Sequence, residues 1–187
     1  REDYPTNYQG PIRDWPPYER VSEGPDECDE LKANYSAIVA LCDAQIGRLL
    51  DYFDDNNLWD DTALIVSTDH GFLLGEHDWW AKNRMPVYDE IAHIPLIVYH
   101  PDFASEGGSR RKALTQTTDL MPTLLDLTLD KGCVDLVEPI EGRSLLSLIG
   151  GDADGWDDQT RSEILFEGVS APGLMIRRGS RKYVHWQ

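Results

Sequence analysis

The sequence lacks the features that mark several common classes of protein. No run approaches the roughly 20 apolar residues that a membrane-spanning helix needs, and the opening REDYPTNYQG has no apolar signal-peptide core. The three cysteines, Cys28, Cys42 and Cys133, are odd in number and have no CxxC spacing. They therefore predict buried free thiols rather than a zinc knuckle or a full disulfide framework.

Basic residues are also scarce. The chain has 17 Lys and Arg against 34 Asp and Glu, which gives a formal charge of −17. This charge repels phosphate backbones, so we expect no nucleic-acid partner, and the missing apolar runs argue against a membrane partner. A small anionic substrate is still compatible, provided that a bound cation or a local Lys or Arg reverses the field at its site.

The residues that are present indicate a globular α/β protein. At 187 residues with 41% hydrophobic residues, the chain is long enough to bury a core. Residues 1–28 are rich in proline and predict an extended segment. From Asp29 to Asn56, apolar residues recur every three or four positions, which predicts an amphipathic helix. The β-branched run at 62–68 predicts a strand buried on both faces of a mainly parallel sheet.

The rest of the chain adds one strand, one helix and a group of antiparallel strands. Residues 94–100 predict a second buried strand, and residues 117–129 predict a second helix, with Thr118 as its cap and Pro122 in its first turn. The remaining segments alternate with glycine-containing turns and predict antiparallel strands at 163–169, 173–178 and 181–186.

These elements divide the chain into three segments. We expect an extended segment at 1–28, an α/β domain at 29–140 and a small antiparallel subdomain at 141–187. Two buried strands and two helices cannot close a doubly wound sheet. We therefore expect the chain to be part of a longer polypeptide; the alternative is that a partner supplies the other strands.

The stretch STDHGFLLGEHDWWAK at 67–82 holds the most reactive side chains. Asp69 and His70 follow the carboxyl end of the first strand, where open α/β sheets place their ligands. Gly71 permits a turn that lets both side chains converge on one ion. The Asp oxygen suits Ca²⁺ or Mg²⁺, and the His nitrogen keeps Mn²⁺ and Zn²⁺ open. The alternative is that Asp-His-Gly only caps the strand.

Two further side chains of this stretch are candidates for chemistry. Lys82 has a flexible stem that can fold back over a metal and neutralise an oxygen of a sulfate or phosphate ester. His77 can protonate or orient the leaving oxygen, because an imidazole titrates near neutral pH. The alternative is a solvated loop anchored by its two tryptophans.

The wider pattern resembles a known family. D-H-G-x-x-L-G-E-H-x-x-W-x-K followed by H-I-P-L-I-V-Y-x-P is similar to the second half of the sulfatases, in the alkaline-phosphatase-like superfamily. The likeness extends upstream to Y-S-A-I-V-A-L-C-D-A-Q-I-G-R-L-L and downstream to the closing R-R-G-S-R-K-Y-V-H-W. It covers residues from about 30 to 187, and it implies part of an alkaline-phosphatase-like sheet with a C-terminal antiparallel sheet.

The resemblance also implies roles for individual residues. Asp69 matches the carboxylate metal ligand, and His70 matches the next ligand position, where many relatives have Asn. Lys82 matches the lysine that contacts the ester oxygens and the nucleophile, and His77 matches a common position whose role is less settled. The implied metal is Ca²⁺, with Mg²⁺ or Mn²⁺ as alternatives. Three residues match a helix that is structural in the family: Asp119, Pro122 and Thr123.

The departures from the family are equally informative. Sulfatases make a formylglycine from the Cys or Ser of a C/S-x-P-S-R motif, and they have two further metal-binding acidic residues near their start. Both features are missing from this sequence. We expect a sulfatase fragment, truncated at both ends and inactive alone, whose full-length protein hydrolyses small sulfate esters. The alternatives are a phosphonate monoester hydrolase or phosphodiesterase of the same superfamily, and a catalytically silent, metal-stabilised domain.

Overall fold

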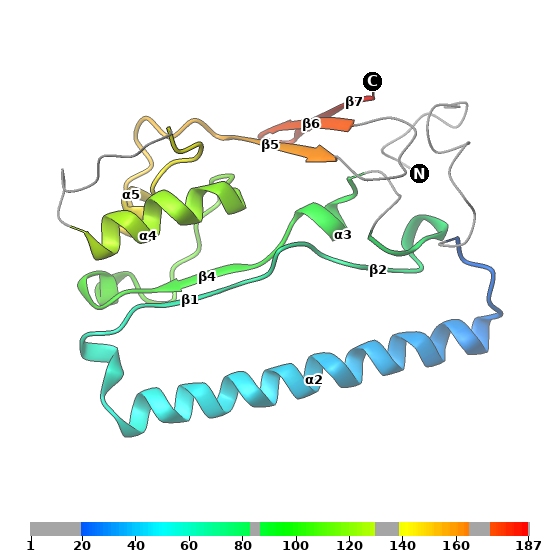
Figure 1. Cartoon of the computed structure of the whole chain (residues 1–187), viewed down its shortest axis with the longest axis horizontal. Helices are drawn as coiled ribbons and strands as arrows, with labels where there is room; N and C mark the ends of the chain where they lie inside the picture. Colours follow the sequence, from blue (N-terminus) through cyan, green and yellow to red (C-terminus); the bar gives the residue numbers. More distant parts are fainter. Residues whose placement is uncertain (1–19, 83–86, 130–138, 165–172, 187) are drawn as a thin grey trace. The chain divides into compact units, whose positions relative to one another are not determined.

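The computed structural model describes residues 20–82, 87–129, 139–164 and 173–186 (Figure 1). These residues form two compact units. In the described ranges, the first unit ends at Pro101 and the second begins at Asp102. The first unit carries residues 67–82.

The first unit begins with the long helix α2 (Pro25–Asp55), drawn in blue and cyan in Figure 1. Gly24 precedes it, and the Glu27 carboxylate accepts the Gly24 backbone N–H at 2.9 Å. The helix ends at Asp55, one residue before the predicted end, and Asn56 caps it: its side-chain amide donates to the Tyr52 carbonyl at 2.8 Å. The predicted start was wrong, because proline is compatible with the first helical position and Pro25 opens the helix there.

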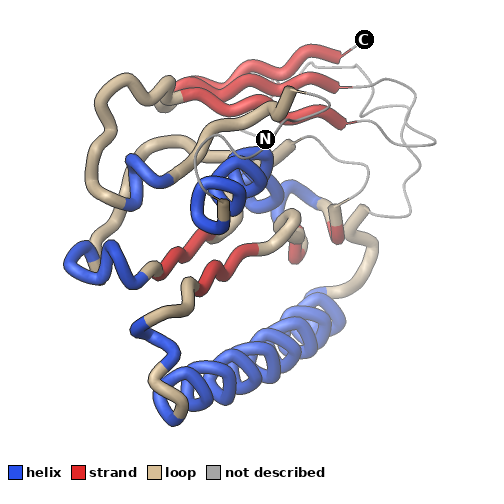
Figure 2. The backbone as a smooth tube through the Cα atoms, turned by 60° about the vertical axis from the view of Figure 1, so that its left-hand side comes forward, coloured by secondary structure: helices blue, strands red, loops and turns tan. Residues whose placement is uncertain are grey.

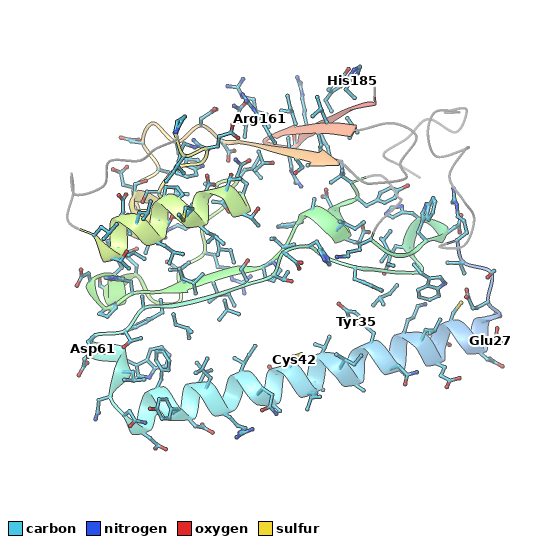
Figure 3. The ribbon with its side chains drawn as sticks, viewed as in Figure 1. Glu27, Tyr35, Cys42, Asp61, Arg161 and His185 are labelled. Carbon is cyan, nitrogen blue, oxygen red and sulfur yellow. The ribbon has the colours of Figure 1, made fainter. Side chains whose placement is uncertain are left out.

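The apolar face of α2 is largely uncovered by the described residues. Phe53 is its buried side chain, and Tyr35 stacks on Phe72 with ring centroids 5.6 Å apart (Figure 3). The exposed apolar side chains of the helix are Leu31, Tyr35, Ile38, Val39, Leu41, Ile46, Leu49 and Tyr52.

Within the described ranges, no helix combines the length and apolar character needed to cross a membrane. Cys28 and Cys42 are free thiols, as predicted, but neither is buried; Cys133 lies outside the described residues.

A 3₁₀ turn, η2 (Leu58–Asp60), connects α2 to the strand β1 (Leu64–Ser67), which pairs with β4 (Leu96–Tyr99). The two strands are antiparallel, with Leu64 opposite Tyr99, so the predicted parallel arrangement is wrong for this pair. The described part of the connection between them consists of loops and short elements. The strands are also less buried than predicted, since Ile97 is 63% exposed.

The segment between β1 and β4 is a small folded hairpin followed by a short helix. The strands β2 (Leu73–Leu74) and β3 (Trp80–Ala81) pair antiparallel around the turn η3 (Glu76–Asp78), and α3 (Asp89–Ala92) follows. Leu73 and Trp79 are buried, and the Arg20 guanidinium lies 3.8 Å from the centre of a Trp79 ring. These contacts fix the loop that sequence analysis singled out.

The second unit begins within the turn η4 (Pro101–Glu106) and continues to η5 (Thr117–Asp119) and the helix α4 (Leu120–Thr128). The predicted second helix is therefore present. Its cap differs from the prediction: Gln116 precedes η5, and the Asp119 carboxylate accepts the Gln116 backbone N–H at 2.9 Å. Thr118 instead accepts a hydrogen bond from the Gln116 side chain at 2.7 Å.

Asp119 and Thr123 connect α4 to the segment that leads into the short helix α5 (Leu146–Ile149). Both side chains are fully buried. The Asp119 carboxylate accepts the Arg143 backbone N–H at 2.9 Å, and the Thr123 hydroxyl accepts the Leu145 backbone N–H at 2.9 Å. The Thr123 hydroxyl also donates to the Asp119 carbonyl at 2.6 Å. These contacts fit the structural role that the family resemblance implied.

The second unit ends in a three-stranded antiparallel sheet, β5 (Gln159–Ile164), β6 (Gly173–Arg178) and β7 (Arg181–Trp186), drawn in red in Figure 2. The predictions for β6 and β7 are confirmed. The first strand starts earlier than predicted, at Gln159, and residues 165–169 of the prediction lie outside the described residues. Met175 is buried on one face of this sheet, while Tyr183 is 66% exposed on the other.

Candidate active site

Asp69 and His70 form the turn that follows β1. The Asp69 carboxylate accepts the His70 backbone N–H at 2.9 Å. The His70 Nδ1 atom lies 2.9 Å from the Gly71 carbonyl oxygen, which can only accept, so Nδ1 carries the proton and a neutral ring has its lone pair at Nε2. This Nε2 atom is 3.1 Å from Asp69 Oδ2. Two electron-rich atoms are thus held side by side at the end of the strand.

The ammonium group of Lys82 contacts one of these two atoms, His70 Nε2. Lys82 follows β3, and its Nζ atom donates a hydrogen bond to His70 Nε2. The structure therefore brings together Asp69, His70 and Lys82, three of the four predicted site residues. A positively charged group at this point reduces the repulsion between the imidazole lone pair and the carboxylate. The same place suits a metal cation.

The charge state of Asp69 follows from its surroundings. Desolvation is the largest influence on the pKa of this carboxyl group and raises it, but the lowering influences, led by the hydrogen bond from the His70 backbone N–H, together outweigh it. The pKa of Asp69 therefore lies below its ordinary value of 3.8. The side chain is 79% exposed, so at neutral pH it is an accessible carboxylate.

The Asp69–Gly71 turn is attached to α3, which lies beside the segment between β1 and β2 in Figure 1. The Gly71 backbone N–H donates to the Ile91 carbonyl at 2.8 Å. A Cβ atom at Gly71 would clash with the carbonyl oxygen of Glu90. The sequence predicts that this glycine permits a turn; in the structure it permits a close approach between two backbone segments.

His77, the fourth predicted residue, lies against α3. Its Nε2 atom is 3.2 Å from Glu90 Oε1, and its ring stacks on Tyr88 with centroids 3.8 Å apart and planes 5° apart. The side chain is 19% exposed. Glu90 and Tyr88 could not be predicted from the sequence, because they are distant from His77 along the chain and no spacing motif connects them.

The donor set fits part of a metal site. A carboxylate oxygen and an imidazole nitrogen converge, and both are in the form that binds a divalent cation. In residues 20–82, 87–129, 139–164 and 173–186, no group of three or more His, Cys, Asp or Glu side chains is gathered. Asp69 and His70 would therefore need further ligands to complete a coordination shell.

Comparison with known proteins decides the family. The Sulfatase family model matches residues 2–130. The chain belongs to the Sulfatase family. This membership agrees with the resemblance drawn from the D-H-G and G-E-H motifs, and it makes the turn after β1 the part of the chain to compare with sulfatase chemistry.

Individual relatives are similar to this chain over part of their length. An N-acetylglucosamine-6-O-sulfatase of Bacteroides thetaiotaomicron is 38% identical over 112 residues, covering 60% of this chain and 19% of that protein. The multifunctional alkaline phosphatase superfamily protein PehA of Trinickia caryophylli is 28% identical over 144 residues, covering 75% of this chain and 26% of that protein. The chain therefore spans about a quarter or less of the length of these two relatives.

A solved structure supports the fold. A crystal structure from Bacteroides thetaiotaomicron, described as that of a sulfatase, has a TM-score of 0.56 and 29% identity over 68% of this chain and 27% of that chain. The α/β, alkaline-phosphatase-like class predicted from the sequence is thus supported at the level of the family. The strand pairs seen in the described residues are all antiparallel, so a mainly parallel sheet is not part of what they show.

Proposed function

We propose that the full-length protein hydrolyses sulfate esters and that this chain supplies one wall of its active site. The observation that carries the proposal is the meeting of the Lys82 ammonium with His70 Nε2, beside the Asp69 carboxylate, in a member of the Sulfatase family. A relative that shares 38% identity is named a sulfatase for a sugar sulfate. Its name supports a sulfate ester as the substrate class.

Asp69 and His70 would hold a divalent cation in this proposal. Ca²⁺ is our first choice because the carboxylate is a hard oxygen ligand, and Mg²⁺ or Mn²⁺ are alternatives. When bound, the cation supplies positive charge that polarises the sulfate oxygens. The hydrogen bond from His70 Nδ1 to the Gly71 carbonyl keeps Nε2 in its ligating form.

Lys82 would bind the ester. Its ammonium donates hydrogen bonds to the sulfate oxygens, and these bonds strengthen as negative charge develops in the transition state. The flexible stem lets the ammonium turn from His70 Nε2 to the substrate. Because the chain carries a formal charge of −17, this local positive charge is also needed to attract an anionic ester.

His77 would orient the leaving oxygen, or protonate it from Nδ1 when the ring is in its protonated form, because Nε2 faces the Glu90 carboxylate. The nucleophile of this proposal is a formylglycine located outside these 187 residues, in a part of the protein that carries the C/S-x-P-S-R motif. The 187-residue chain alone is then expected to be inactive, and turnover of a sulfate ester by the purified chain would contradict this part of the proposal.

A second candidate is hydrolysis of phosphodiesters or phosphonate monoesters. The observation in its favour is the 28% identity to a multifunctional member of the alkaline phosphatase superfamily over 75% of this chain. The same arrangement of Lys82, His70 and Asp69 can bind a phosphoryl group, because both esters present negatively charged, non-bridging oxygens.

The test compares two substrates on the full-length protein. Values of kcat/KM are measured with an aryl sulfate and with the matching aryl phosphodiester, in the presence of Ca²⁺, Mg²⁺ or Mn²⁺. Asp69→Asn is expected to abolish most of the activity, whereas Asp126→Asn, on the exposed surface of α4, serves as the matched control. A higher value for the phosphodiester would favour the second candidate, and hydrolysis of neither ester would contradict both.

A further inference from the structure

Glu90 contacts two parts of the candidate active site at once. Its carboxylate oxygens lie 3.2 and 3.3 Å from His77 Nε2. Its backbone carbonyl borders Gly71 so closely that a Cβ atom there would clash, and Gly71 follows directly on the two proposed metal ligands. Glu90 therefore connects residues 75–82, called the η3 loop below because they contain η3, to the turn that carries those ligands.

The contact with Glu90 determines which ring nitrogen of His77 carries the proton. An ionised carboxylate has acceptors only, so the hydrogen bond requires that His77 Nε2 carries a proton. The parallel Tyr88 ring, 3.8 Å away, holds the imidazole plane so that Nε2 stays directed at the carboxylate. A neutral His77 is therefore held as the Nε2–H tautomer.

The backbone of the η3 loop also has a conformation that needs stabilising contacts from neighbouring side chains. His77, Asp78 and Ala81 have φ angles of 57°, 65° and 68°. These angles lie in the left-handed region, which residues other than glycine adopt less readily. Residues in this region persist where surrounding contacts determine them, and they are common in active-site loops. The strained loop ends at Lys82, so its conformation sets where the ammonium can reach.

We propose that Glu90 is the positioning residue of this site: it holds His77 as the Nε2–H tautomer and, through His77, fixes the strained loop that presents Lys82. The catalytic part of this inference rests on the proposed sulfatase function. The tautomer part does not, because it follows from the Glu90–His77–Tyr88 contacts alone.

The first experiment reads the tautomer. The full-length protein is labelled with ¹⁵N-histidine, and the His77 ring signals are identified by their loss in His77→Gln. In the wild type we expect one protonated nitrogen, at Nε2, when the ring is neutral. Glu90→Ala should give the averaged signals of two exchanging tautomers. Glu90→Gln should keep the Nε2–H form, because its amide oxygen also accepts a hydrogen bond. Glu30→Gln, which changes an exposed glutamate on α2, is the control and should leave the signals unchanged.

The second experiment measures kinetics on an aryl sulfate. Glu90→Ala is expected to lower kcat by roughly 10- to 100-fold with KM changed less than about twofold, because a supporting residue outside the reacting shell is lost. Glu90→Gln should recover most of kcat. This recovery separates positioning from a general loss of folding, which the thermal midpoint of each variant also monitors.

The outcomes distinguish the two proposals. The inference is overturned if Glu90→Ala keeps the wild-type His77 tautomer, or if its kcat stays within twofold of an active wild type. If the wild type hydrolyses no sulfate ester while Glu90→Ala still changes the tautomer, the proposed function fails and the structural role of Glu90 stands.

Discussion

Gly71 gives the sharpest test of how the Asp69–Gly71 turn is built. In Gly71→Ala, the added methyl group would meet the Glu90 carbonyl, which belongs to the backbone of α3 and cannot rotate away. The turn and the helix must separate, which weakens the 2.8 Å hydrogen bond from Gly71 to Ile91. Overpacking costs about 1–3 kcal/mol and a lost hydrogen bond about 0.5–1.5 kcal/mol. We expect a total destabilisation of about 2–4 kcal/mol.

Urea denaturation of the full-length protein measures this loss, and the chain offers a matched control. Gly47 lies inside α2, and a Cβ atom there would meet nothing within 4 Å. Gly47→Ala should therefore be neutral or stabilise the protein by up to about 1 kcal/mol, because alanine is the better helix former. An unfolding midpoint of Gly71→Ala equal to that of the wild type would refute the close approach of the turn to α3.

Two further predictions concern buried and acidic groups. Asp119→Asn replaces one of two carboxylate oxygens that accept backbone N–H groups at 2.9 Å, so we expect a loss of about 1–3 kcal/mol in urea denaturation. Asp126→Asn, on the exposed side of α4, should cause no change. The pKa of Glu23 is lowered from its ordinary 4.5 by the Ser22 backbone N–H and then by the Trp80 indole N–H. The stabilisation from Glu23 is therefore complete above pH 4.5 and is lost as the pH falls through the lowered pKa. In a pH titration followed by NMR, the Trp80 indole proton resonance should shift with a midpoint below pH 4.5. A midpoint above pH 4.5 would contradict the hydrogen bond between the two side chains.

Local sequence patterns predicted the elements of the fold better than their pairing. The helical periodicity that gave α2 and the alternation that gave β6 and β7 depend on neighbours along the chain, and these elements are present. The direction in which β1 and β4 pair depends on how the intervening segment folds back, and no local pattern encodes it. This is why a continuous β-branched run was wrongly assigned to a parallel pair.

The site shows the same division between local and distant information. Asp69, His70 and Lys82 lie in one contiguous stretch with a recognisable spacing, so the sequence could nominate them together. Glu90 approaches through a backbone contact and a hydrogen bond that depend on the placement of α3, which a single sequence does not reveal. The role of Gly71 was likewise visible only once the backbone of α3 was in place.

The activity of Lys82→Ala in the full-length, metal-loaded protein tests the proposed site most directly. Removing one donor to the developing charge should lower kcat for an aryl sulfate by roughly 10²- to 10³-fold. Lys112→Ala, an exposed lysine of the second unit, is the control and should match the wild type. A Lys82→Ala protein that hydrolyses the aryl sulfate at the wild-type rate would contradict the assignment of this chain's Lys82 to the catalytic site.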